Sequence, residues 1–271
     1  MNKGVKLFLL AVFIVSFLPG HAADRFITVA STTSTENSGL FGHLLPVFSQ
    51  STGIEARVVA VGTGRAIKLA MNGDADVLFV HHKPSEESFV AKGYGEQRLD
   101  VMYNDFVVVG PVLDPASIRE TGNAVQALQA IAAGTYLFIS RGDDSGTHKK
   151  EQSLWQEASM DPVKDSGDWY RETGSGMGAT LNVASAMNAY TITDRASWLK
   201  FANKGDLDLL LQGDHRLFNQ YGIILVSRNR HPHVSSADGQ QFIDWLLSNE
   251  GQELIDAYRI EGQQAFFANG R

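Results

Sequence analysis

Short segments that combine hydroxyl side chains with glycines lie where a strand pattern gives way to a helix pattern. Five hydroxyl residues, 31–35, follow the apolar run 26–30 and precede a helix-period run. Thr63 and Gly64 follow the strand-like run 57–61 in the same way. At such junctions the backbone N–H groups are unpaired and the helix dipole is positive, so the chemistry on offer is anion binding. Taken alone, the hydroxyl run could be a plain helix cap, and the segment with Thr63 and Gly64 a plain tight turn.

A third segment of this kind, residues 141–147, carries the most specific pattern in the chain. It is Arg-Gly-Asp-Asp-Ser-Gly-Thr, and it joins the strand-like residues 135–140 to a helix pattern. Arg141 offers a guanidinium fork, while Ser145 and Thr147 offer hydroxyls beside free backbone N–H groups. This combination predicts an oxyanion site.

The acidic and imidazole groups of the same segment allow other roles. Asp143 and Asp144 look misplaced beside an anion, and we expect them to cap the helix or to fix the direction of Arg141. Ser145 with His148 could instead belong to a nucleophile triad in an exported serine hydrolase. The chain has no G-x-S-x-G elbow, and a histidine three residues after a serine on one helix rarely has triad geometry. We therefore expect no enzyme.

Two further segments carry polar residues whose role the sequence leaves open. Residues 168–178 form a fourth Gly/hydroxyl loop, but the pattern is not G-x-G-x-x-G, so no dinucleotide fingerprint applies. His81 and His82 end the strand-like run 76–80, where neighbouring side chains point to opposite faces. No other histidine has a ligand spacing, so we expect neither a metal site nor a cofactor. Whether His81 or Tyr190 contacts a ligand stays open.

Strand and helix patterns alternate along most of the chain. Strand-like runs occur at residues 26–30, 57–61, 76–80, 105–109, 135–140, 189–194 and 222–227. An amphipathic helix or helix pair at residues 237–258 closes the chain. Short alternating β and α elements predict a parallel α/β sheet, with ligands beyond the carboxyl ends of the strands.

The first 22 residues have the pattern of a signal peptide. Lys3 and Lys6 form a basic region, residues 7–18 an apolar core too short to span a membrane, and cleavage is expected between Ala22 and Ala23. The chain contains no cysteine, so neither a disulfide nor a lipid-carrying Cys is available. These features predict a free periplasmic protein.

The charge balance excludes several partners. The formal net charge of -7 becomes -9 once Lys3 and Lys6 are removed. An acidic exported chain is not expected to bind nucleic acid or an anionic membrane, and it cannot attract an anion over long range. Affinity for an anion must then come from short-range, desolvated donors.

The pattern at residues 141–147 resembles periplasmic phosphate-binding proteins, which use an Arg and, four residues on, Ser-Gly-Thr as oxyanion ligands. The whole mature chain resembles, more narrowly, the tungstate-binding components of ABC uptake systems, the TupA family. The matching segments are residues 31–35 with 38–40, 61–64, 72–77, 102–106, 141–148 and 176–181. One departure is Ser31, where the family's hydroxyl run usually opens with Thr.

The resemblance implies a periplasmic-binding-protein-like α/β fold of type II, with two lobes, a hinge and an interlobe ligand cleft. The first lobe would comprise residues 23–107 and 219–271, and the second residues 108–218. The implied oxyanion ligands are Thr32, Thr33, Thr63, Gly64, Arg141, Ser145, Gly146, Thr147 and Thr173. The implied ligand is tungstate or molybdate, and the implied partner of this monomer is an ABC permease and ATPase complex.

The protonation state of the ligand narrows this choice. Tungstate and molybdate are fully deprotonated near neutral pH, so a matching site offers donors only. Hydrogen phosphate needs an acceptor, which phosphate-binding proteins supply as an Asp after an early strand. Here the comparable position carries His81, which disfavours phosphate. Sulfate is rejected only by size and molybdate by nothing visible, and the sequence does not separate transport from sensing.

Overall fold

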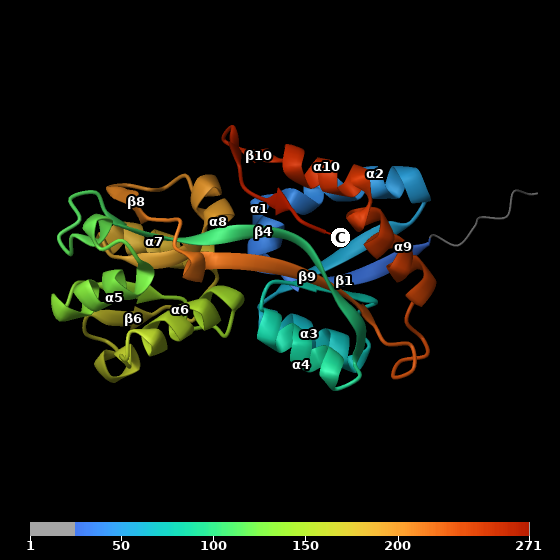
Figure 1. Ribbon diagram of the computed structural model, residues 1–271, viewed down its shortest axis with the longest axis horizontal. Helices are drawn as coiled ribbons and strands as arrows, with labels where there is room; N and C mark the ends of the chain where they lie inside the picture. The colour runs from blue at the N-terminus through green and yellow to red at the C-terminus, as the bar shows by residue number, and fades with distance from the viewer. Residues whose placement is uncertain (1–24, 271) are drawn as a thin grey trace, which may run out of the picture.

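The computed structural model describes residues 25–270, so the predicted signal peptide at residues 1–22 lies outside the described residues. Two α/β lobes lie side by side, and two long strands, β4 (Gly95–Pro111) and β9 (Phe218–Val226), run from one lobe to the other (Figure 1). This architecture confirms the predicted fold class. Among the described helices, none is long and apolar enough to cross a membrane.

The first lobe is built on a mixed sheet, so the prediction of a parallel sheet is wrong for part of it. Strand β1 (Phe26–Thr32) pairs in parallel with β2 (Glu55–Val61) and with β3 (Val77–Val80). By contrast, β9 is antiparallel to β3, and β4 is antiparallel to β9 and to β12 (Phe267–Ala268). Helices connect β1, β2 and β3, which favours parallel pairing, whereas β9 returns from the second lobe and enters the sheet from the opposite end.

Helices cover both faces of this sheet. They are α1 (Thr33–Ser38), α2 (Leu40–Thr52), α3 (Thr63–Asn72), α4 (Lys83–Ala91), α9 (Ser236–Leu247) and α10 (Asn249–Ala257). Helices α2, α9 and α10 lie on one side and α3 and α4 on the other (Figure 1). The predicted helix pair near the C-terminus is thus confirmed, and the two-residue strands β10 (Arg259–Ile260) and β11 (Gln263–Gln264) follow it.

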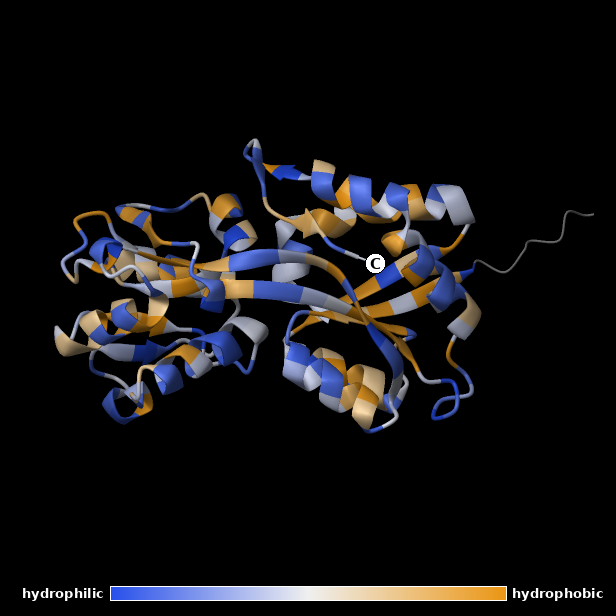
Figure 2. Cartoon of the chain, in the orientation of Figure 1, coloured by the Kyte–Doolittle hydropathy of each residue, from blue (hydrophilic) through white to orange (hydrophobic). Residues whose placement is uncertain are grey.

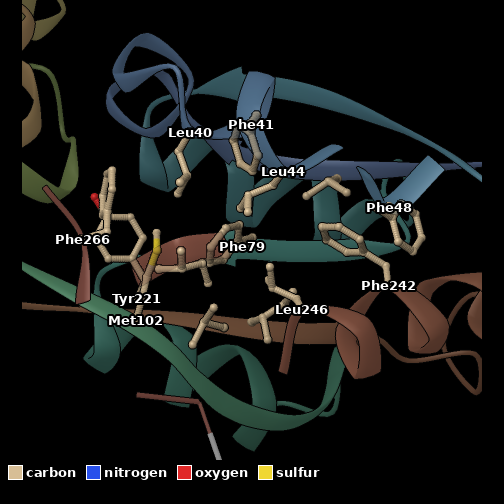
Figure 3. Close-up of a cluster of buried hydrophobic side chains, with 14 of the residues drawn as sticks. Leu40, Phe41, Leu44, Phe48, Phe79, Met102, Tyr221, Phe242, Leu246 and Phe266 are labelled. Atoms are coloured by element: carbon tan, nitrogen blue, oxygen red, sulfur yellow. The ribbon is translucent and has the colours of Figure 1, made fainter. Parts of the chain in front are cut away.

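The core of the first lobe is aromatic and aliphatic. Phe79 of β3 packs against Phe41 of α2, and Phe48 of α2 packs against Phe242 of α9 (Figure 3). Orange apolar stretches in Figure 2 follow the strands, while the helices alternate apolar and polar residues, as helices with one buried face do. Burial of these side chains holds the ends of β1, β2 and β3 in fixed positions.

The second lobe has its own strands and helices. The far end of β4 pairs antiparallel with β7 (Thr191–Asp194) and β8 (Leu207–Leu211), and β5 (Phe138–Ser140) pairs in parallel with β6 (Tyr170–Glu172). The helical segments are η1 (Ile118–Glu120), α5 (Ala124–Ala133), α6 (Gly146–Glu157), η2 (Pro162–Asp165), α7 (Met177–Met187), α8 (Arg195–Lys200) and η3 (His215–Leu217). Separate apolar clusters fill this lobe, including Phe138, Trp155 and Tyr170.

The lobes are joined where β4 and β9 pair with each other. Asn104 lies opposite Asn219, and the next pair is Asp105 with Phe218. Beyond this point β4 leaves β9 and pairs with β7, starting at Phe106. The lobe boundaries at residues 107/108 and 218/219 stay a prediction.

Candidate functional site

The hydroxyl run 31–35 ends β1 and begins α1. Thr32 is the N-cap of α1, and its Oγ1 accepts a hydrogen bond from the Thr35 backbone N–H at 3.4 Å. The same oxygen lies 2.7 Å from Thr35 Oγ1 and 3.1 Å from Ser34 Oγ. Thr33, the first residue of α1, is half-buried. The cap predicted as the plain alternative is therefore present, within a buried cluster of hydroxyls.

The second-lobe loop between β5 and α6 holds Arg141 in one direction. Arg141 Nη2 donates to Asp143 Oδ2 at 2.6 Å, and Asp143 Oδ1 accepts from the Ser145 backbone N–H at 3.2 Å. The predicted role of Asp143 in orienting Arg141 is confirmed, but the predicted helix cap is not, because Ser145, and neither Asp143 nor Asp144, caps α6. Ser145 is the N-cap of α6, and its Oγ accepts from the His148 backbone N–H at 3.2 Å. Arg141 is 3% exposed, so its charge is largely desolvated.

The N-termini of α3 and α6 bring the two lobes into contact. The Gly146 backbone N–H donates to Thr63 Oγ1 at 3.0 Å, which is a hydrogen bond from one lobe to the other. Gly64 lies against the Asp144 carboxylate. A pocket of about 490 Å³ opens beside this contact. Its lining is Thr33, Ala60, Val61, Gly62, Gly64, Arg65, Lys68, Arg141, Asp143, Asp144, Gly174, Ser175 and Gly176.

A chain of buried side chains leads from α1 to the crossing strands. Asn219 Nδ2 donates to Asn104 Oδ1 at 2.6 Å, which leaves Asn219 Oδ1 to accept from His81 Nδ1 at 3.1 Å. With Nδ1 carrying the proton, His81 Nε2 accepts from Ser34 Oγ at 3.3 Å. Burial lowers the pKa of His81 to about 4, so the ring is neutral and both nitrogens are satisfied. His82 instead contacts Ser85 Oγ, at 2.6 Å.

Several buried polar atoms in this region have no partner. Of seven such side-chain atoms in residues 25–270, five lie where the lobes and crossing strands meet: Asn104 Nδ2, Arg141 Nε, Thr147 Oγ1, Asp194 Oδ2 and Tyr221 OH. We call these five the unpartnered cluster. Buried polar atoms are nearly always hydrogen-bonded, so their concentration here indicates a ligand-binding site. Four of the five can donate.

The charged and polar groups of the unpartnered cluster shift one another's pKa values. Burial raises the pKa of Asp194 above its usual value, and the hydrogen bonds from Ser197 and the charge of Arg141 lower it by less. Burial raises the pKa of Tyr221, and the charge of Asp194 raises it further. The polar groups of Asn104 and Asn219 also lie near the Tyr221 hydroxyl and lower its pKa. The sequence prediction missed Asn104, Asp194, Asn219 and Tyr221 as site residues.

Asp194 departs from the expectation of a site that offers donors only. It ends β7 and caps α8, with Oδ1 accepting from the Ser197 backbone N–H at 2.9 Å. It is 1% exposed. When ionised, its free Oδ2 is an acceptor, so the donor-only argument against hydrogen phosphate holds only if this carboxyl carries a proton.

Two residues considered from sequence have hydroxyls that are already engaged within the second lobe. Thr173 Oγ1 lies 3.3 Å from the carbonyl oxygens of Ser140 and Arg141 and 2.9 Å from Thr180 Oγ1. Tyr190 OH donates to Asp114 Oδ1 at 3.0 Å. The Thr173 hydroxyl is thus used by backbone carbonyls beside Arg141. The predicted residues Thr32, Thr63, Arg141, Ser145, Gly146 and Thr147 are all buried.

The geometry around Ser145 does not form a nucleophile–base pair. Ser145 Oγ contacts the backbone N–H of His148, not its ring. The His148 ring is engaged elsewhere, because Nδ1 accepts from the Asp144 N–H at 3.2 Å and Nε2 lies 3.2 Å from Gln152 Nε2. Among the described residues there is also no group of three His, Asp or Glu side chains that could hold a metal ion.

Comparisons with known proteins agree on one family. A family model described as the PBP superfamily domain matches residues 19–250. The tungstate-binding protein TupA of Peptoclostridium acidaminophilum is 48% identical, over 88% of this chain and 83% of the relative. The TupA protein of Campylobacter jejuni is 35% identical, over 88% of this chain and 89% of the relative.

Solved structures give the same result. The tungstate-binding protein TupA from Desulfovibrio alaskensis G20 aligns with a TM-score of 0.80 at 42% identity, covering 91% of this chain and all of that structure. A structure described as the tungstate ABC transporter from Geobacter sulfurreducens aligns with a TM-score of 0.79 at 46% identity, covering 87% of this chain and all of the other. Sequence and fold therefore agree along nearly the whole described chain.

Proposed function

This chain belongs to the PBP superfamily and, within it, to the TupA family of tungstate-binding proteins, and we propose that it is the periplasmic receptor that delivers tungstate to an ABC importer. The observation that carries this proposal is the unpartnered cluster. Its buried donors come from the second lobe and from both crossing strands, and they surround the point where the lobes touch. It is a binding protein and not an enzyme.

The donor set suits a tetrahedral dianion. Arg141 Nε and Thr147 Oγ1 donate from the second lobe, and Asn104 Nδ2 and Tyr221 OH donate from the crossing strands. The capping hydroxyls add to these, because Thr63 and Ser145 only accept in their bonds to Gly146 N–H and His148 N–H. Each therefore keeps its own O–H for a ligand oxygen. Thr32, Thr33 and Gly64 of the sequence prediction complete the proposed ligand set. Thr173 does not belong to it, because its hydroxyl and its backbone N–H are engaged within the second lobe.

Arg141 supplies the charge for this interaction. It is buried, it is held by Asp143, and its Nε is free to donate. Because the net charge of the chain is negative, long-range attraction does not concentrate the anion. A desolvated guanidinium at hydrogen-bond distance does so at short range. Molybdate has the same shape and charge as tungstate and is the alternative ligand, and no resident cofactor is proposed.

The proposed cellular setting follows from the family. A relative in Haloferax volcanii, 43% identical, carries the name putative ABC transporter anion-binding protein. Such a receptor needs to reach the outer side of the cytoplasmic membrane, and the signal-peptide pattern of residues 1–22 supports export to the periplasm. The protein acts as a monomer that docks on the permease after closing.

Isothermal titration calorimetry with tungstate, molybdate, sulfate and phosphate tests the proposal. We expect tungstate to bind, and Arg141→Gln to weaken binding about tenfold to a hundredfold, the loss expected for a hydrogen bond from a charged donor. Arg119→Gln is the control, since Arg119 pairs with Asp208 on the surface of the same lobe. Binding of no oxyanion, or full affinity in Arg141→Gln, would overturn the proposal.

A further inference from the structure

Asp194 is a carboxylate in the wrong place for an anion site. It lies at the end of β7, opposite Phe106 of β4, at the point where that strand leaves the first lobe. Helix α8, which it caps, packs against the hydroxyl-bearing helix α1. Its Oδ2 has no partner and the residue is 1% exposed. The carboxyl is thus buried at the junction of the two lobes, as the one acidic member of the unpartnered cluster.

No nearby cation compensates this carboxyl. Within residues 25–270 no Lys, Arg or His side-chain nitrogen lies within 4.0 Å of the Asp194 carboxylate oxygens. The adjacent Arg195 is bound to Asp105 through two contacts of 2.6 Å each. Arg141 interacts with Asp194 at longer range but makes its ion pair with Asp143.

The other groups around this junction cannot supply the charge either. Lys150 of α6 lies over the Phe106 ring, but its Nζ donates to the Arg216 carbonyl at 2.7 Å. His81 of the first lobe is neutral, with both ring nitrogens bonded. Tyr221 of β9 faces the carboxyl as a neutral phenol. An ionised Asp194 beside a dianion would therefore be two like charges in a desolvated space, which is strongly unfavourable.

We propose that Asp194 takes up one proton from solution when the oxyanion binds, and that its protonated Oδ2 donates a hydrogen bond to an oxyanion oxygen. This inference rests on the proposed function. It restores a site that offers donors only, because a protonated carboxyl donates where the carboxylate could only accept. On binding, the complex gains one proton from solution and one dianion, so its net charge becomes more negative by one unit instead of two.

The sign of the pH dependence follows from linkage. In this proposal Asp194 is ionised in the open, unliganded protein, where water reaches the carboxyl, and protonated in the closed complex. Binding is then tighter at lower pH. Between the pKa of this carboxyl in the free protein and its higher pKa in the complex, the affinity falls about tenfold for each unit that the pH rises. Tungstate itself stays fully deprotonated near neutral pH, so protonation of the ligand does not contribute to the pH dependence of the affinity.

Calorimetry of the mature protein with sodium tungstate between pH 6.5 and 8.5, in buffers of different ionisation enthalpy, counts the protons taken up. We expect wild type to take up close to one proton. Asp194→Asn keeps the cap and a donor at the same position, so it should bind tungstate while taking up none, with nearly constant affinity. Asp114→Asn is the matched control, since Asp114 also accepts backbone N–H bonds, in the second-lobe core.

Two results would overturn the inference. One is tight binding by wild type without proton uptake. The other is proton uptake that persists in Asp194→Asn; if that uptake is lost in His81→Gln, the proton belongs to the imidazole. If no oxyanion binds to wild type at any pH, the proposed function itself fails, so the two failures are distinguishable.

Discussion

Thr147 lies in the first turn of α6, is 1% exposed and has a hydroxyl without a hydrogen-bond partner. Removing an unpaired buried hydroxyl costs the free protein nothing, but the bound oxyanion loses a donor. We therefore expect Thr147→Val to bind tungstate about tenfold more weakly, with an unfolding free energy that is unchanged or up to about 1 kcal/mol higher. Calorimetry and urea unfolding without ligand measure the two quantities.

Thr191→Val gives the opposite signature and serves as the control. The Thr191 hydroxyl is equally buried, but it donates to the Ile139 carbonyl at 2.7 Å. Its loss leaves that carbonyl unpaired and should destabilise the protein by about 1–3 kcal/mol, with the affinity for tungstate retained. If Thr147→Val behaves like Thr191→Val, then Thr147 is a structural residue and not a ligand.

Glu151, on the buried face of α6, makes the stability of the protein pH-dependent. Its carboxylate accepts from Ser140 Oγ, Trp155 Nε1 and Tyr170 OH, all neutral donors. Burial raises its pKa from 4.5 to about 7. The folded state thus binds more protons than the unfolded state, so this stabilising contribution is complete below pH 4.5 and is lost as the pH rises to about 7.

Urea unfolding between pH 4.5 and 8 checks this consequence. In wild type we expect the unfolding free energy to fall by up to about 3 kcal/mol between pH 4.5 and 7 because of Glu151. In Glu151→Gln this decline should be absent. Glu157→Gln on the same helix is the control, because that side chain is half-exposed and pairs with Arg216. An identical slope in wild type and Glu151→Gln would contradict the assignment.

At the scale of elements, sequence patterns located the strand-to-helix junctions and a strand within each crossing strand, at residues 105–109 and 222–227, but not the first ten residues of β4. Strands β1, β2 and β3 were predicted because their apolar residues are continuous or strongly β-branched. The first ten residues of β4, 95–104, mix charged and apolar residues, since that part of the strand is only partly buried. Strand β8 and helix α8 were also missed, being five and six residues long.

Some residues of the candidate site could be predicted from the sequence and others could not. Residues 141–147 form one local motif, so Arg141, Ser145 and Thr147 could be predicted together. Asn104 and Tyr221 come from strands more than a hundred residues apart in the chain, and their types are ordinary on a strand. Only the antiparallel pairing of β4 with β9 brings them together, and no local spacing encodes that pairing.

The contact between the N-termini of α3 and α6 depends on a glycine. A Cβ on Gly146 would lie 2.7 Å from His81 Cε1 in the other lobe. Gly146→Ala should therefore prevent full closure and weaken tungstate binding at least tenfold, while the free protein is as stable as wild type, because Ala favours the helix. Gly178→Ala is the control: Gly178 also lies in the first turn of a helix, α7, with nothing near its Cβ position. Calorimetry on both variants should show a loss of tungstate affinity in Gly146→Ala alone.

At the scale of the whole molecule, each lobe has a core of its own. The lobes are joined by β4 and β9, by the contact at the helix N-termini and by α8, whose Ala196 and Leu199 pack into the core of the first lobe. The buried donors are divided between the lobes and the crossing strands, so none of the three parts surrounds an oxyanion alone. Opening the lobes exposes these donors to water, and closing them around the anion replaces that water. The structure, with Gly146 bonded to Thr63, has the lobes in contact.

The absence of cysteine allows this closure to be measured directly. Lys68 and Gly176 line the interlobe pocket from opposite lobes, and both are exposed, so Lys68→Cys with Gly176→Cys can carry a pair of spin labels. Because the ligand stabilises only the closed state, tungstate should shift the distance distribution to shorter values and narrow it. Lys68→Cys with Lys92→Cys, both in the first lobe, should show no change. An unchanged Lys68–Gly176 distribution at saturating tungstate would mean that the receptor binds without closing, and that the lobe contact between Gly146 and Thr63 is independent of the ligand.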